Sequence, residues 1–202
     1  CNPAADFTAI HADRAAAEAC IAFNTRALDY LLRSRVVDTV IISSPFGYFY
    51  GGYTHYLQAG QTIPRDVELA REALIDTVRQ LQSSGKRVWI FSPPPSTDFE
   101  VGDCLERAMS GAVLLGRRDC AIDAELSRSR LQPVMHNLEA VQAETGARLI
   151  SLPDLLCEQL TCATFLNGVP LYRDRLHLSV DGSIELLRDL PLPAAGEGTH
   201  GS

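Results

Sequence analysis

The segment LYRDRLHLSVDGS, residues 171–183, places an acid and a histidine three positions apart. Histidine works as a general base near neutral pH when its tautomer and ring orientation are fixed. A carboxylate that accepts from Nδ1–H fixes both and leaves Nε2 to take a proton from a hydroxyl. A spacing of three on a turn can bring Asp174 to His177, and the flanking Arg173 and Arg175 can hold the acid ionised. The alternative interpretation is a surface aspartate and a helix-capping histidine.

A general base of this kind needs a nucleophile. Ser43 and Ser44 follow a predicted central strand and are the only serines well placed by topology, but neither lies in a G-x-S-x-G elbow. The simpler interpretation is that both are loop serines that satisfy backbone groups. The histidines outside the motif show no ligand spacing, so the sequence predicts no metal site and no cofactor.

Apolar periodicity predicts the elements that must position these residues. Helical spacing is found over 13–34, 64–84, 128–145 and from Ser179 to about 190, with Asp13 and Ser179 as the predicted N-caps. Residues 36–43, 87–95 and 147–156 are typical of strands, and 44–61 is expected to be a loop. Residues 165–172 indicate a hairpin with an Asn167-Gly168 type I′ turn, and 96–127 is expected to be irregular.

The alternation of strands and helices predicts an α/β fold, a three-layer α/β/α sandwich with a mainly parallel central sheet. We expect a single domain over residues 1–190 and a disordered tail over 191–202. Sites in such sheets form beyond the carboxyl ends of the strands. The loops after Ser43 and Phe91 and the region 153–179 meet that condition.

Six cysteines indicate the compartment. They fall into sequence-local pairs that predict the disulfides Cys1–Cys20, Cys104–Cys120 and Cys157–Cys162, and hence an oxidising space outside the cytoplasm. Two alternatives are free buried thiols and, for Cys1, the lipidated first residue of a lipoprotein, which would leave Cys20 without its local partner.

Composition excludes several function classes. The chain has 202 residues and a formal net charge of −7, with no basic patch that would suit a nucleic acid. No apolar run reaches the roughly 18 residues of a membrane helix. A Gly-rich loop concentrates aromatic residues that either contact a glycan, with Tyr48, Tyr50 and Tyr53 as the candidates, or pack the loop itself.

The motif LYRDRLHLSVDGS resembles the last signature block of the SGNH hydrolase superfamily, where D-x-x-H supplies the acid and base of a Ser-His-Asp triad. The chain is more closely similar to the SGNH domain fused behind the membrane acyltransferase-3 domain in bacterial O-acetyltransferases of cell-surface polysaccharide. The resemblance covers essentially residues 1–190. Its other motifs are Cys1 with Pro3, C-I-A-F-N at 20–24, the VVDTVIIS strand, FSPPP at 91–95, D-C-L-E-R-A at 103–108, C-x4-C at 157–162 and NGVPLYRD running into HLS.

The sequence departs from the family at two places. The family nucleophile lies in a G-D-S-H block on the first strand, and that block is missing here, so we expect the chain to lack the first strand and helix. Superfamily members often place an oxyanion-hole asparagine near 43–47, where this chain has SSPFG. The candidate oxyanion or substrate loop is therefore Ser43, Ser44 and Phe46, with backbone N–H groups carrying more of the stabilisation.

The resemblance implies an extracytoplasmic domain that moves an acyl group, most simply acetyl, onto a glycan, with His177 as base and Asp174 as its partner. The acyl donor would come from a membrane acyltransferase domain of the same protein, which would also tether it through missing N-terminal segments. The alternatives are a non-catalytic glycan-binding or docking module of SGNH fold, and a secreted esterase.

Overall fold

The computed structural model describes residues 1–49, 53–111 and 119–191. The chain divides into two compact units. The first unit contains Cys1–Ser92 and Pro133–Ile150, and the second contains Pro93–Gln132 and Ser151–Leu192. Nearly all of the tail expected at 191–202 lies outside the described residues.

A parallel sheet is the centre of the first unit. Its strands are β2 (Thr39–Ser43), β5 (Arg87–Phe91) and β7 (Arg148–Ile150), hydrogen-bonded in the order β2-β5-β7. The β-branched run of β2 and the buried run of β5 are typical of such strands. The three strands confirm the expected α/β class and the parallel pairing, although each is shorter than the sequence pattern suggested.

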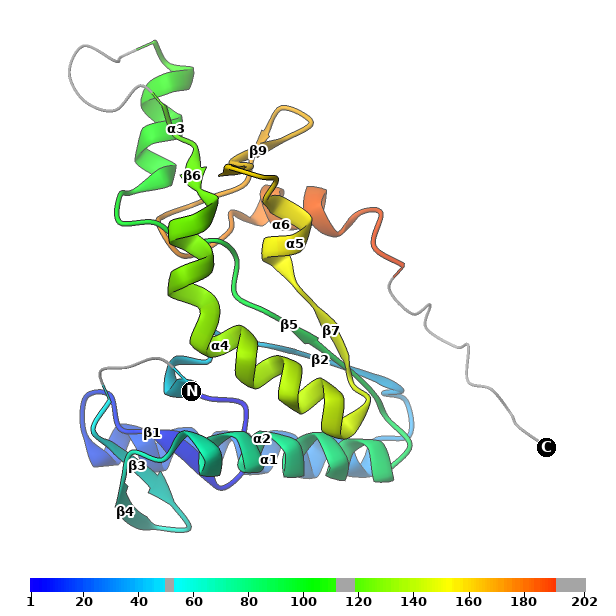
Figure 1. Ribbon diagram of the computed structural model, residues 1–202. Helices are drawn as coiled ribbons and strands as arrows, with labels where there is room; N and C mark the ends of the chain where they lie inside the picture. The colour runs from blue at the N-terminus through cyan, green and yellow to red at the C-terminus, as the bar shows by residue number, and fades with distance from the viewer. Residues whose placement is uncertain (50–52, 112–118, 192–202) are drawn as a thin grey trace. The chain divides into compact units, whose positions relative to one another are not determined.

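Long helices accompany this sheet (Figure 1). They are α1 (Arg14–Arg33), α2 (Val67–Ser83) and the C-terminal part of α4 (Ala124–Thr145). Asp13 caps α1 by accepting from Ala16 N–H, and Asp66 caps α2 by accepting from Leu69 N–H. These bonds satisfy amide groups that the first helical turn leaves free, which explains where both helices begin.

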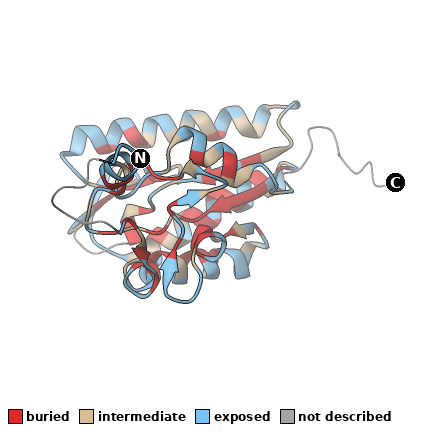
Figure 2. Ribbon diagram, turned by 90° about the horizontal axis from the view of Figure 1, so that it is seen from above, coloured by how far each residue is buried: buried red, intermediate tan, exposed pale blue. Residues whose placement is uncertain are grey.

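One face of the parallel sheet packs into the core. Side chains of β2, β5, α2 and α4 form one buried cluster, and they include Val40, Ile42, Val88, Ile90, Leu74, Val78, Val134 and Leu138. The helices keep exposed residues along their outer sides, drawn pale blue in Figure 2.

Strand β2 is the edge of the described parallel sheet. The Asp38 carbonyl accepts from Arg87 N–H, so by strand alternation the main-chain groups of Thr39, Ile41 and Ser43 face away from β5. No described strand pairs with that side. Ile41 is 51% exposed, although it lies in the middle of the strand.

A second sheet in the first unit was not expected. It consists of β1 (Phe7–Ala9), β3 (His55–Gln58) and β4 (Gln61–Pro64), which pair antiparallel in the order β1-β3-β4. The sequence predicted a loop over 44–61, which contains β3, so that prediction was wrong for this part of the loop. The turn between β3 and β4 has φ of 46° at Ala59 and 77° at Gly60, and alanine rarely adopts the left-handed conformation, so the hairpin signal was missed.

Short elements build the second unit. The segment expected to be irregular contains helix α3 (Val101–Met109) and strand β6 (Ile122–Asp123), which pairs with β8 (Thr161–Cys162). The strand expected over 147–156 ends at Ile150, because Ser151 caps helix α5 (Leu152–Leu156). That expectation was wrong for its second half.

Two expectations for the second unit are confirmed. Strands β9 (Phe165–Leu166) and β10 (Val169–Pro170) form the expected hairpin, with positive φ at Asn167 and Gly168. Ser179 caps α6 (Val180–Leu187) by accepting from Gly182 N–H.

The structure forms the three expected disulfides, Cys1–Cys20 in the first unit and Cys104–Cys120 and Cys157–Cys162 in the second. No thiol is left free. Among the described residues, no helix combines the length and apolar character needed to span a membrane.

Loop closure predicts how much two of these bridges stabilise the second unit. Cys104 and Cys120 are 16 residues apart, so replacing both by serine should lower the free energy of unfolding by about 3 kcal/mol. The matched control replaces Cys157 and Cys162, which are 5 residues apart, and should cost only about 2 kcal/mol. Urea denaturation of both variants measures the difference, and a larger loss for the shorter bridge would contradict this ranking.

Candidate active site

The segment carrying Asp174 and His177 is a closed loop in the second unit. Arg173 N–H donates to the His177 carbonyl at 2.9 Å, and Ser179 N–H donates to the Leu171 carbonyl at 2.8 Å. Between these two bonds, Tyr172 and Leu178 form an antiparallel bridge. The two ends of the loop are therefore fixed side by side, and the acid and the histidine both lie within it.

The Asp174 carboxylate accepts hydrogen bonds from the main chain that follows it. Its Oδ1 accepts from Leu176 N–H and from His177 N–H, each at 2.8 Å. Aspartate commonly makes such bonds to its own chain two and three residues on. The position of the carboxylate is thus set by local backbone geometry.

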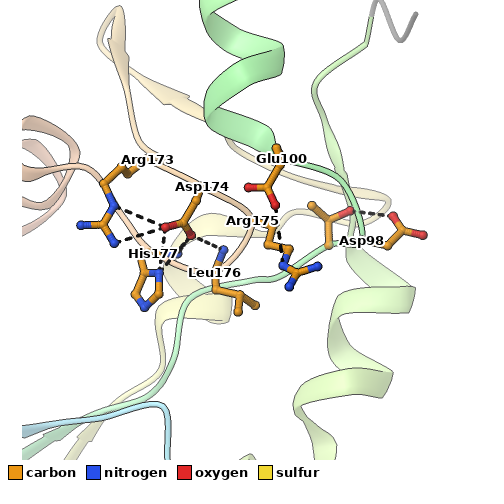
Figure 3. A network of polar contacts seen from close by, with 8 residues as sticks. Asp98, Glu100, Arg173, Asp174, Arg175, Leu176 and His177 are labelled. Carbon is orange, nitrogen blue, oxygen red and sulfur yellow. Dashed lines mark hydrogen bonds and ion pairs between the residues drawn. The ribbon is translucent and has the colours of Figure 1, made fainter.

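The same carboxylate holds the histidine ring (Figure 3). Nδ1 of His177 lies 3.0 Å from Oδ1 and 2.9 Å from Oδ2 of Asp174. An ionised carboxylate only accepts, so Nδ1 carries the proton and Nε2 is left with its lone pair. The His177 side chain is 54% exposed, which leaves the ring accessible to a reacting hydroxyl.

The pKa of Asp174 is lowered well below its ordinary value. Burial by itself would raise the pKa. The hydrogen bonds from the Leu176 and His177 amides, the His177 ring and the Arg173 guanidinium outweigh burial, because they stabilise the charged form. Asp174 is therefore ionised throughout the neutral range and can only accept from the His177 ring.

The two flanking arginines behave differently. Arg173 donates from Nε and Nη2 to Oδ2 of Asp174 at 3.3 and 3.2 Å, as the sequence suggested. Arg175 pairs instead with Glu100, with Nε 3.8 Å from Oε1, so it binds the residue before α3 rather than the acid (Figure 3).

The candidate oxyanion or substrate loop lies in the first unit. Ser43 ends β2 with an exposed side chain, and Ser44 Oγ accepts from Phe46 N–H at 3.2 Å. Phe46 has φ of 48°, which is strained for a bulky residue, and strain of this kind gathers at functional loops. Phe46 as a whole is buried, with its ring against Tyr48 and Phe49, so the ring is part of the core of the first unit.

The three tyrosines predicted to contact a glycan differ in how far they are buried. Tyr48 is completely buried in the core, and burial raises its pKa far above the ordinary value, so the structure does not present it to a glycan. Tyr53 is partly exposed and lies against the His11 ring, with centroids 4.2 Å apart. Tyr50 lies outside the described residues. The described part of the chain also contains no group of three or more His, Cys, Asp or Glu that could hold a metal ion.

Sequence reasoning missed the residues that surround the loop. Glu100 pairs with Arg175, and Gly102 and Gly182 bring two helix starts against the loop backbone. The sequence contained no signal for Gly102, because residues 96–127 were expected to be irregular; Gly182 lies in a predicted helix, where a glycine lowers helix stability.

Comparison with known proteins places the chain in a family. The family model described as "SGNH domain (fused to AT3 domains)" matches residues 1–190. No curated protein matches the chain. The periplasmic domain of a lipopolysaccharide acetyltransferase from Salmonella ser. Paratyphi A has a similar fold, with a TM-score of 0.57 and 18% sequence identity. That match covers 92% of this chain and 66% of the solved one, so the chain spans just under two thirds of that solved chain.

These findings define a mixed α/β domain of SGNH type. The chain belongs to the family of SGNH domains that are fused to AT3 domains.

The lowered pKa of Asp174 has a consequence for stability. A carboxyl group with a lowered pKa stabilises the fold above its unfolded value, ordinarily 3.8, and this contribution is lost as the pH falls through the folded pKa. Asp174→Asn should therefore lower the free energy of unfolding at pH 7 but differ progressively less from the wild type below pH 4. Urea denaturation at pH 7, 4 and 2 measures this, and a difference that stays constant or grows in acid would contradict it.

Proposed function

We propose that this chain is the extracytoplasmic domain of an O-acyltransferase that moves an acyl group, most simply acetyl, onto a hydroxyl of a cell-surface polysaccharide. The observation that carries the proposal is the contact of His177 Nδ1 with both oxygens of Asp174, at 2.9 and 3.0 Å, in a chain of the SGNH family. Residues 1–190 act together as one domain in this proposal, since the family model covers both units.

In the first half-reaction a serine attacks the carbonyl carbon of the acyl donor. Nε2 of His177 takes the serine proton as the new C–O bond forms, and Asp174 stabilises the imidazolium through Nδ1–H. The tetrahedral intermediate then collapses, and His177 returns the proton to the departing donor group. The acyl group is left on the serine.

In the second half-reaction a sugar hydroxyl loses its proton to Nε2 of His177 and attacks the acyl-serine. Collapse of this second intermediate breaks the serine ester, and the serine recovers the proton. Water in place of the sugar would give hydrolysis by the same steps, so a secreted esterase uses the same dyad.

The nucleophilic serine lies outside these 202 residues in this proposal. Ser43 and Ser44 lack a nucleophile elbow, and Ser44 Oγ is engaged with Phe46 N–H. Two features of β2 fit the addition of a further segment: its outer main-chain groups pair with no described strand, and Ile41 is half exposed beside them. The same segment, with the donor domain, would tether the chain at the membrane.

Location outside the cytoplasm is supported by the disulfides, which persist in oxidising compartments. The acceptor is proposed to be a glycan because the structurally similar Salmonella domain belongs to a lipopolysaccharide acetyltransferase. Of the candidate tyrosines that the structure describes, Tyr53, beside the His11 ring, is the one exposed enough to contact a sugar.

Substitution of the dyad in the full-length protein tests the proposal. His177→Ala and Asp174→Asn should each lower kcat for acyl transfer by roughly 10²–10⁴-fold, because the first removes the base and the second its fixed tautomer. The matched control is His136→Ala, an exposed histidine of α4 outside the site, which should leave kcat unchanged.

The 202-residue chain by itself should turn over p-nitrophenyl acetate negligibly, since it lacks the serine. Turnover by the isolated chain that survives His177→Ala, or normal transfer by the full-length His177→Ala protein, would contradict the proposal. Normal transfer by the full-length His177→Ala protein, together with glycan binding by the isolated chain, would favour a non-catalytic module.

A further inference from the structure

Two helices of the second unit begin against the backbone of the loop that carries the dyad. One is α3 and the other is α6, and each has a glycine in its first turn, Gly102 and Gly182. Glycine is a poor helix former compared with alanine, so both positions give up helix stability. A specific structural need must therefore account for them.

In α3 the glycine allows the helix to approach the backbone of Arg173 closely. A Cβ added to Gly102 would lie 2.0 Å from the Arg173 carbonyl oxygen and 2.6 Å from its carbonyl carbon. Both atoms belong to the main chain, so no side chain could rotate away to make room. Glu100, just before this turn, also pairs with Arg175. The start of α3 is thus seated directly on the chain that flanks Asp174.

In α6 the glycine allows the helix to approach the backbone of Leu171 closely. A Cβ on Gly182 would lie 2.6 Å from both the Cα and the carbonyl oxygen of Leu171, and 2.8 Å from Ser179 Oγ. Ser179 Oγ accepts from Gly182 N–H and donates to the Pro170 carbonyl. The first turn of α6 is therefore tied to the entry of the loop as well as packed on it.

Neither glycine is needed for a left-handed backbone. Positive φ values are found at Gly60, Gly85, Gly111, Gly146 and Gly168, and a Cβ at those positions would meet open space. Gly102 and Gly182 show the opposite combination: neither has a positive φ, and neither has room for a Cβ atom. Their role is therefore contact with the loop backbone.

We propose that Gly102 and Gly182 are positioning residues for the dyad: they let α3 and α6 hold residues 171–173 between them, which keeps Asp174 on His177. The catalytic meaning of this inference rests on the proposed function. Any side chain at either position pushes a helix away from the loop, and a shift of about 1 Å at a catalytic group can cost about 10²-fold in rate.

Amide hydrogen exchange of the isolated chain tests the positioning directly. In Gly102→Ala the amides of Arg173 and His177, which close the loop and bind Asp174, should exchange at least 10-fold faster than in the wild type. The amide of Ala124, which donates to the Leu160 carbonyl in the same unit, is the internal reference and should be unchanged. In the full-length protein the variant should lower kcat by about 10²-fold with KM nearly unchanged.

Arg107→Ala, an exposed position in the last turn of α3 that does not share the Gly102 face of the helix, is the matched control and should alter neither quantity. Gly182→Ala repeats the test from the other helix, with the same expected results. Unchanged exchange at Arg173 and His177 in both folded glycine variants would overturn the inference. Failure of both variants to fold would overturn it too, because the glycines would then serve the whole unit rather than the loop.

The two proposals fail separately. Faster amide exchange in the glycine variants, combined with full activity of His177→Ala, would contradict the proposed function but support the positioning role of the two glycines. Loss of activity in His177→Ala, combined with unchanged amide exchange in the glycine variants, would support the proposed function and contradict the positioning role of the two glycines.

Discussion

The site depends on a carboxylate that its own chain holds in place. Asp174 accepts from the amides of Leu176 and His177, so the loop cannot keep its shape without presenting the carboxylate to the following ring. The bonds also stabilise the charged form, which lowers the pKa of Asp174 and ensures that it acts as an acceptor toward Nδ1. One local arrangement therefore supplies the position, the charge and the tautomer. A half-exposed histidine can act as a defined base because its partner is fixed rather than mobile.

The rest of the second unit fixes the ends of that loop. Leu171 and Tyr172 are buried in its core cluster, whereas His177 remains exposed. Helix α3 is bridged by Cys104–Cys120 to the chain just before β6, and β6 pairs with β8, whose Cys162 is bridged to Cys157. The Thr164 carbonyl then accepts from Leu171 N–H at the entry of the loop. A unit with few and short strands is thus held by covalent bridges and backbone bonds that surround the dyad.

Much of this was predictable, because the controlling interactions are local in sequence. The D-x-x-H turn, the Asp13 and Ser179 caps and the Asn167-Gly168 hairpin each depend on residues within a few positions. The disulfides followed from the spacing of the cysteines. What the sequence could not supply depends on tertiary contacts: Ala59 in a left-handed turn, the pairing of Arg175 with Glu100, and the seating of Gly102 on Arg173. The functional hypothesis came from the family resemblance, because an Asp and a His at this spacing are by themselves common.

The position of the proton on the His177 ring shows whether Asp174 fixes the tautomer that a general base needs. Two-dimensional ¹H–¹⁵N spectra of the imidazole in the isolated chain, recorded where the ring is neutral, distinguish a protonated Nδ1 from a protonated Nε2. We expect Nδ1–H in the wild type, because both Asp174 oxygens lie within 3.0 Å of that atom. A ring that carries its proton on Nε2, or that exchanges freely between the two tautomers, would contradict this expectation.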